Sequence, residues 1–230
     1  MSMNDDTKLR RRPRGRRDDG AATRQQILEV AGEVFATKGV DRATGKEIAE
    51  RAGANSAAVN YYYGGIDQLY GEVLVEAHRR LVAYDVLAAV AKGDGEPEDK
   101  LRRLIGIVIA AVMSPDRASW PLRVLSREVL APSAMFEMLR ERELLPKKSL
   151  LIGLIGELLG LPADDPAVAR CCISIIAPVL MLLIGDRTVV ARMFPAIIEG
   201  EGAREAMAEH IARFALGGLG AIAANLPAHQ

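Results

Sequence analysis

Apolar residues recur at intervals of three and four along most of this chain, and Gly and Pro interrupt the pattern without any strand-like alternation. Leu, Ile, Val and Ala supply most of the apolar side chains, and aromatic residues make up only 4% of the 230 residues. Strands favour β-branched and aromatic residues, so a composition poor in aromatics favours helices. The sequence therefore predicts an all-α protein and excludes a β-sandwich or barrel.

Capping signals divide the first third of the chain into short helices. Thr23 with Gln26 and Thr44 with Glu47 have capping-box spacing, and Asn55 is placed to cap a third helix. The first helix is expected to begin at Thr23 and to end at Lys38 and Gly39. Longer helices are expected beyond them, over residues 67–91, 98–113, 117–130, 133–160 with a possible break at Pro146, 166–185 and 204–224.

The segment Gly45 to Tyr62 has the residues that a helix-turn-helix requires. Ala49 is small where two helices would cross, and Gly53 tolerates the positive φ of a tight turn. Apolar side chains that could lock the pair against a supporting helix follow at helical intervals, at Ile48, Ala52, Ala54 and Val59. The exposed face of the second helix is left with small, polar and aromatic side chains, which suit a DNA major groove.

Residues 23–69 resemble the DNA-binding domain of the TetR family of bacterial transcriptional regulators. The resemblance lies in TRQQILEVAGEVFATKGVDRAT, GKEIAERAGANSAAVNYYYGG and IDQLYGEVL, which run consecutively from Thr23. Within that family, AAVNYYYGG, LSREVLAPSAMF and CCISIIAPVLM resemble the CecR-like subgroup, which is linked to drug sensitivity. The resemblance implies an N-terminal three-helix head over residues 21–66 and a larger helical ligand-binding and dimerisation body over 67–230.

The resemblance also implies which residues contact double-stranded DNA. The recognition helix would be Ser56 to Tyr62, where an Asn amide can bond adenine and small or aromatic side chains can pack on thymine methyls. Phosphates would be held by side chains and by helix N-termini. The predicted DNA-binding residues are Thr23, Thr44, Lys46, Asn55, Ser56, Ala57, Asn60, Tyr61 and Tyr62. Tyr63 is expected in the core of the head, and Ile66 stands where the family commonly has a phosphate-binding Lys.

Charge is unevenly distributed although the net charge is zero. Residues 1–60 carry twelve Lys or Arg against nine Asp or Glu, and six of the arginines lie between Arg10 and Arg17. We expect residues 1–20 to form a disordered basic arm, either a solvated tail or a non-specific phosphate contact.

The body is expected to supply a homodimer contact and an effector site. The apolar segments Val168 to Gly185 and Arg204 to Ala224 are candidates for a four-helix intersubunit bundle. We expect a small-molecule site with an adaptable apolar lining and a few polar contacts. Its predicted residues are His78, Met113, Trp120, Arg123, Arg127, Glu128 and Phe136. The competing interpretation is that these side chains pack in the core.

Together with the helix order, the resemblance implies a homodimeric repressor that leaves a palindromic operator when a small molecule binds the body. The alternative is an effector-independent, architectural DNA-binding protein. The sequence shows no catalytic or metal motif, so we predict no enzyme activity, no cofactor and no metal, and we interpret the adjacent Cys171 and Cys172 as core residues. The uncharged runs stop short of a membrane span, and a cytoplasmic location is expected.

Overall fold

The computed structural model describes residues 15–114, 119–198, 200 and 202–226, and all regular structure within them is helical. The first part contains α1 (Gly15–Lys38), a 3₁₀ turn (Val40–Arg42), α2 (Gly45–Arg51), α3 (Ala58–Tyr63) and α4 (Ile66–Leu81). The remainder contains α5 (Tyr84–Lys92), α6 (Pro97–Val112), α7 (Trp120–Leu130), α8 (Phe136–Leu139), a π turn (Arg140–Leu144), α9 (Leu145–Leu159), α10 (Pro166–Ile184), α11 (Arg187–Met193), α12 (Pro195–Ile198) and α13 (Ala203–Ala223). The all-α prediction is confirmed.

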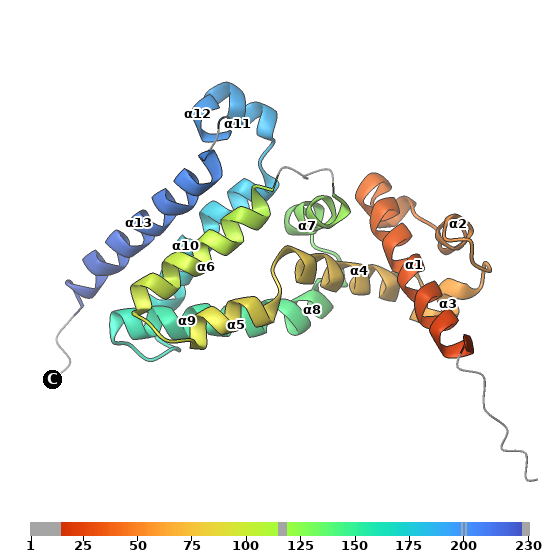
Figure 1. The fold of residues 1–230 in the computed structure, drawn as a ribbon, viewed down its shortest axis with the longest axis horizontal. Helices are drawn as coiled ribbons and strands as arrows, with labels where there is room; N and C mark the ends of the chain where they lie inside the picture. The colour runs from red at the N-terminus through yellow and green to blue at the C-terminus, as the bar shows by residue number, and fades with distance from the viewer. Residues whose placement is uncertain (1–14, 115–118, 199, 201, 227–230) are drawn as a thin grey trace, which may run out of the picture.

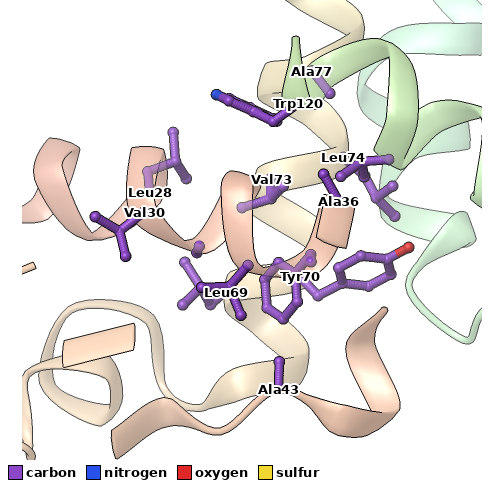
Figure 2. Close-up of a cluster of buried hydrophobic side chains, with 14 of the residues drawn as sticks. Leu28, Val30, Ala36, Ala43, Leu69, Tyr70, Val73, Leu74, Ala77 and Trp120 are labelled. Atoms are coloured by element: carbon purple, nitrogen blue, oxygen red, sulfur yellow. The ribbon is translucent and has the colours of Figure 1, made fainter. Parts of the chain in front are cut away.

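Buried side chains form two hydrophobic cores. Helix α4 runs from the N-terminal helices toward α5 and links the two groups of helices (Figure 1). The head core contains buried residues of α1–α4 and also of α7, among them Phe35, Leu69 and Trp120. Figure 2 shows this cluster, with Trp120 entering it beside Ala77. The body core joins α5, α6, α10 and α13 to α9, which spans Leu145–Leu159. The predicted head therefore packs directly on the body through α4 and α7.

The start of α1 corrects two expectations. Residues 1–14 of the expected arm lie outside the described residues, but residues 15–20 are helical, so the arm does not extend to residue 20. Thr23 is consequently inside α1 and is not its cap; its hydroxyl donates to the carbonyl of Asp19 at 2.8 Å. No proline follows Pro13 in this stretch, and Asp18 and Asp19 suit the first turns of a helix, so the helix continues backward past Thr23.

The predicted helix over residues 67–91 is two helices, because the chain leaves helical geometry at Val82. Val82 has φ −148° and ψ 109°, and its side chain is buried in the body core. The residues of α4 before it belong mainly to the head core, whereas Leu87 of α5 belongs to the body core. The break redirects the chain from one core to the other, which helical spacing alone could not reveal.

Between α8 and α9 the chain stays helical, with a π turn that ends two residues before Pro146. Proline lacks the N–H that an α-helix needs, and a wider turn accommodates it. The possible break at Pro146 is therefore a local widening. The short helices α11 and α12, between α10 and α13, were not predicted.

Among the described residues, α10 is long and apolar enough to cross a membrane by length and composition, with a mean hydropathy of 2.4. The helix reaches this length by including Arg170, and the uncharged run that follows Arg170 stays short of a span, as expected. One such helix is weak evidence for a span, since core and interface helices have similar compositions.

Candidate nucleic-acid interface

Helices α2 and α3 are joined by a turn whose hydrogen bonds match the predicted motif. The Thr44 hydroxyl accepts a hydrogen bond from the N–H of Glu47 at 3.2 Å and caps α2. Gly53 has φ 65°, a conformation that favours glycine, and the N–H of Ala54 donates back to Ala49 at 2.8 Å. The Asn55 side chain accepts from the N–H of Ala57 at 2.9 Å, so residues 56–57 form a capped turn and α3 begins at Ala58.

The buried faces of α2 and α3 fix this unit on α1 and α4. Ile48, Ala49 and Val59 are at most 2% exposed and belong to the head core. The Lys38 ammonium at the end of α1 lies 2.6 Å from the Glu47 carboxylate of α2. A second ion pair, between Arg51 of α2 and Glu33 of α1, spans 3.5 Å, so packing and ion pairs together hold the unit on α1.

Tyr63 closes the end of α3, and its expected place in the head core is confirmed. It is 8% exposed, and its hydroxyl donates to the carbonyl of Arg24 at 2.7 Å. The Arg24 guanidinium lies 4.8 Å from the centre of the ring. Burial raises the pKa of Tyr63 to about 12, so the phenol remains a hydrogen-bond donor at neutral pH.

The opposite face of the unit is open to solvent. Seven predicted DNA-binding residues are exposed on it: Thr44, Lys46, Asn55, Ser56, Ala57, Asn60 and Tyr61. Tyr61 is 81% exposed, and its ring meets that of the half-buried Tyr62 edge to face, at 4.8 Å between centres. The face thus presents hydroxyls, an amide, an ammonium group and a bulky aromatic pair, a set able to contact base edges and phosphates.

Thr23 differs from the predicted contact scheme, whereas Ile66 agrees with the expected loss of a phosphate-binding lysine. Thr23 cannot hold a phosphate through a helix N-terminus, because it lies in the middle of α1. Ile66 is the first residue of α4 and packs partly against the head core, so it provides no cation there. Among the predicted DNA-binding residues, the cation closest in sequence to Ile66 is Lys46, which is exposed on α2.

The seven residues predicted to line an effector site are not brought together around one cavity. Trp120, Arg123 and Arg127 extend from α7 to α1, where they bond Glu29, the carbonyl of Ala36 and the carbonyl of Thr37 respectively. Glu29 was not predicted as a contact residue. Its position on α1 would suit an exposed acid equally well, because the sequence does not show that Trp120 lies beside it.

Two other predicted pocket residues, Glu128 and Phe136, also lie among core contacts. Glu128 is 1% exposed and accepts hydrogen bonds from the Tyr70 hydroxyl at 2.8 Å and from the N–H of Ser133 at 2.8 Å. Phe136 packs partly buried on the head core, and Met113 does so on the body core.

His78 belongs to a buried charged cluster between α4 and the start of α9. Its Nδ1 lies 2.8 Å from the Lys147 ammonium, which is 2.6 Å from the Glu143 carboxylate. Burial lowers the pKa of His78, which favours the neutral ring. Burial by itself raises the pKa of Glu143, but contacts with His78 and Lys147 outweigh it and lower that pKa to about 2.

Two shallow grooves on the described surface are lined by other residues. One lies between α6 and α13, and its lining includes Arg102 and Arg204. The other lies where α4, α6 and α7 meet, and Arg80 and Leu122 contribute to it. None of the seven predicted pocket residues lines either groove, so the effector site stays a prediction.

Comparison with known proteins assigns both parts of the chain. Residues 97–219 match the family described as the C-terminal domain of the HTH-type transcriptional dual regulator CecR, and residues 27–73 match the bacterial regulatory proteins of the tetR family. The CecR regulator of Shigella flexneri is 26% identical over 182 residues, covering 75% of this chain and 81% of that protein. The repressor AcnR of Corynebacterium jeikeium is 33% identical over 102 residues, covering 44% of this chain and 47% of that protein.

Solved structures show the same fold. The FadR regulator of Bacillus subtilis in complex with stearoyl-CoA has a TM-score of 0.64 at 15% identity, covering 84% of this chain and 98% of that chain. NalD of Pseudomonas aeruginosa, a secondary repressor of a multidrug efflux pump, has a TM-score of 0.61 at 23% identity, covering 87% and 98%. The chain is a member of the TetR family of transcriptional regulators, with a C-terminal domain of the CecR type.

Proposed function

We propose that this protein is a homodimeric repressor that binds a palindromic operator through α2 and α3 and leaves it when a small molecule binds the body. The observation that carries the proposal is the single open face of the helix-turn-helix unit, where Asn60 and Tyr61 are exposed while Val59 and Tyr63 are buried. Asn60 can read adenine in the major groove, and Thr44 and Lys46 can hold phosphates. Thr23, Asn55, Ser56, Ala57 and Tyr62 complete the proposed contact set, with Thr23 acting through its side chain.

One helix-turn-helix unit reads too few base pairs for specificity, so a second copy is required. The exposed apolar side chains of α10 and α13 supply a surface for it. Ile173 and Met181 on α10 are 69% and 63% exposed, and Phe214 on α13 is 78% exposed. Helices α10 and α13 contact each other within the protomer, so two copies can form a four-helix bundle from these faces.

The release step requires a body state in which the two heads no longer fit the operator. Helix α4 supports this step, because it contributes to the head core and leads directly into the body core through Val82. Bacillus subtilis FadR, which has the same fold, was solved in complex with stearoyl-CoA, and this supports a small-molecule effector for the present chain. We place the protein in the cytoplasm, where it can reach DNA, and assign it no catalytic activity.

Fluorescence anisotropy tests the DNA-binding step. The full-length protein is titrated onto the duplex upstream of its own gene and onto a scrambled duplex of equal length, at two salt concentrations. Preference for the native duplex that survives the higher salt supports a specific regulator. Equal, salt-sensitive binding to both duplexes indicates instead the effector-independent architectural protein.

The dimer is tested with Phe214→Glu, and Val86→Glu serves as the matched control. Val86 on α5 is 49% exposed and lies outside the proposed bundle face. We expect the Phe214 variant to sediment as a monomer and to lose operator binding, because a charge cannot be buried unpaired in an apolar interface. The control should remain a dimer. An unchanged mass for the Phe214 variant would contradict this interface.

A further inference from the structure

The carboxylate of Glu29 joins the head to two separate parts of the body. Arg80, at the end of α4, donates to it through both terminal nitrogens, with Nη1 2.9 Å from Oε2. Trp120, the first residue of α7, donates its indole N–H to the same Oε2 at 3.2 Å. We call these three residues the clasp. The arginine and the indole come from two helices, α4 and α7, which contact each other and α1.

The tryptophan of the clasp is seated directly on the backbone of α1. A Cβ at Gly32, one turn after Glu29, would lie 2.4 Å from the Trp120 ring, closer than any side chain could be tolerated. The Arg80 guanidinium lies 5.1 Å from the centre of that ring. Trp120 is 9% exposed, so packing against Gly32 and the hydrogen bond to Glu29 together determine where the indole lies.

Two further side chains extend the contact between α7 and α1. Arg123 donates to the carbonyl of Ala36 at 2.9 Å, and Arg127 donates to that of Thr37 at 3.3 Å. With Trp120 they occupy positions i, i+3 and i+7, which share one face of α7. These α1 carbonyls lie at its last turn, shortly before the chain enters α2. Helix α7 therefore contacts α1 from the clasp to the base of the helix-turn-helix unit.

We propose that the clasp sets the angle of the head on the body and thereby selects the distance between operator half-sites. Glu29, Arg80 and Trp120 are positioning residues in this scheme, and none of them contacts DNA. The inference rests on the proposed function, because only a dimer on two half-sites can select a spacing. A shift of one α3 by the rise of a base pair, about 3.4 Å, puts its half-site out of register.

The experiment uses Glu29→Gln and Trp120→Phe in the full-length protein, with Glu33→Gln as the control. Glu33 is also on α1, but its ion pair with Arg51, at 3.5 Å, lies within the head and does not reach the body. Each protein is titrated onto the operator duplex and onto duplexes whose half-sites are one or two base pairs closer or farther apart. Gly32→Ala is a second way to disrupt the clasp, because the added methyl group forces the Trp120 indole away from α1.

Wild type and Glu33→Gln should favour one spacing, whereas the clasp variants should lose about tenfold of that preference, the value of one charge-assisted hydrogen bond. Trp120 is the only tryptophan of the chain, so its fluorescence should shift in Glu29→Gln and Gly32→Ala but not in Glu33→Gln. A spacing preference unchanged in the clasp variants, or an equal loss of affinity at every spacing, overturns the clasp while leaving the proposed function intact. Absence of operator binding by wild type overturns both.

Discussion

Removal of the Tyr70 hydroxyl provides a direct test of how the head is fixed to the body. Tyr70 on α4 is 6% exposed and donates to Oε2 of Glu128 on α7 at 2.8 Å. Burial and the neighbouring Glu128 raise the pKa of Tyr70, which keeps the phenol protonated as the donor. In Tyr70→Phe the ring keeps its edge-to-face contact with Phe35, at 5.0 Å between centres, and only the hydrogen bond is lost.

The cost follows from the burial of Glu128, which is 1% exposed. Its other oxygen keeps two hydrogen bonds from Ser133, but Oε2 loses the donor that the structure provides. Among the described residues no buried side-chain oxygen or nitrogen lacks a partner, so the variant introduces the first one. Such a loss costs about 1.5–3 kcal/mol. For a chain of this size, that lowers the melting temperature by about 3–12 °C.

Thermal unfolding followed by circular dichroism measures this change, and two other tyrosines calibrate it. Tyr63→Phe removes a half-buried bond to a carbonyl and should cost about 0.5–1.5 kcal/mol. Tyr61→Phe alters a ring that is 81% exposed and should leave the melting temperature unchanged. A Tyr70→Phe protein that melts with wild type would refute the argument that this buried hydrogen bond stabilises the contact of α4 with α7.

Three further changes test separate features. Asn60→Ala should weaken operator binding by about 1–3 kcal/mol without lowering the melting temperature, and equal anisotropy titrations would argue against base contact. Gly53→Ala should destabilise the protein by about 1–2 kcal/mol in urea, because φ is 65° there; an unchanged midpoint would contradict this strain. The pKa of Glu143, about 2, lies below its unfolded value, so its stabilisation is complete above about pH 4.5 and disappears as the pH falls toward 2. Glu143→Gln should therefore show a shallower acid limb in urea titrations against pH, and an identical limb would exclude this contribution.

Local signals predicted most of the head correctly. The cap at Thr44, the turn that Asn55 closes before α3 and the turn at Gly53 depend on bonds between residues at most five positions apart, so a single segment contains the necessary information. Thr23 shows the limit of the same reasoning. It has the spacing of a cap, but no residue between Gly15 and Thr23 stops the helix, and α1 uses the Thr23 hydroxyl to bond Asp19.

Contacts between distant helices account for the rest. The break at Val82 is determined by which core its side chain enters, and the sequence around it remains compatible with one continuous helix. Trp120, Arg123 and Arg127 were predicted as pocket residues because a tryptophan and arginines can recognise a ligand. Their spacing predicts that the three side chains share one face of a helix. The sequence does not predict which other helix packs against that face. In the structure it is α1, whose carbonyls and Glu29 satisfy the same donors.

An apolar helix such as α10 can lie in a protein core, in a membrane or in a dimer interface, and composition alone does not separate these three cases. The exposure of its side chains does. A core helix is buried on most of its surface, but only 28% of the apolar window of α10 is buried in the protomer. A helix in lipid is apolar around its whole circumference, but α10 exposes Ser174 and Arg170. Cys171, Cys172 and Ile175 face the body core, whereas Ile173 and Met181 face outward. Burial on one side with large apolar side chains on the other matches a helix that completes its packing against a second copy, which supports the proposed dimer.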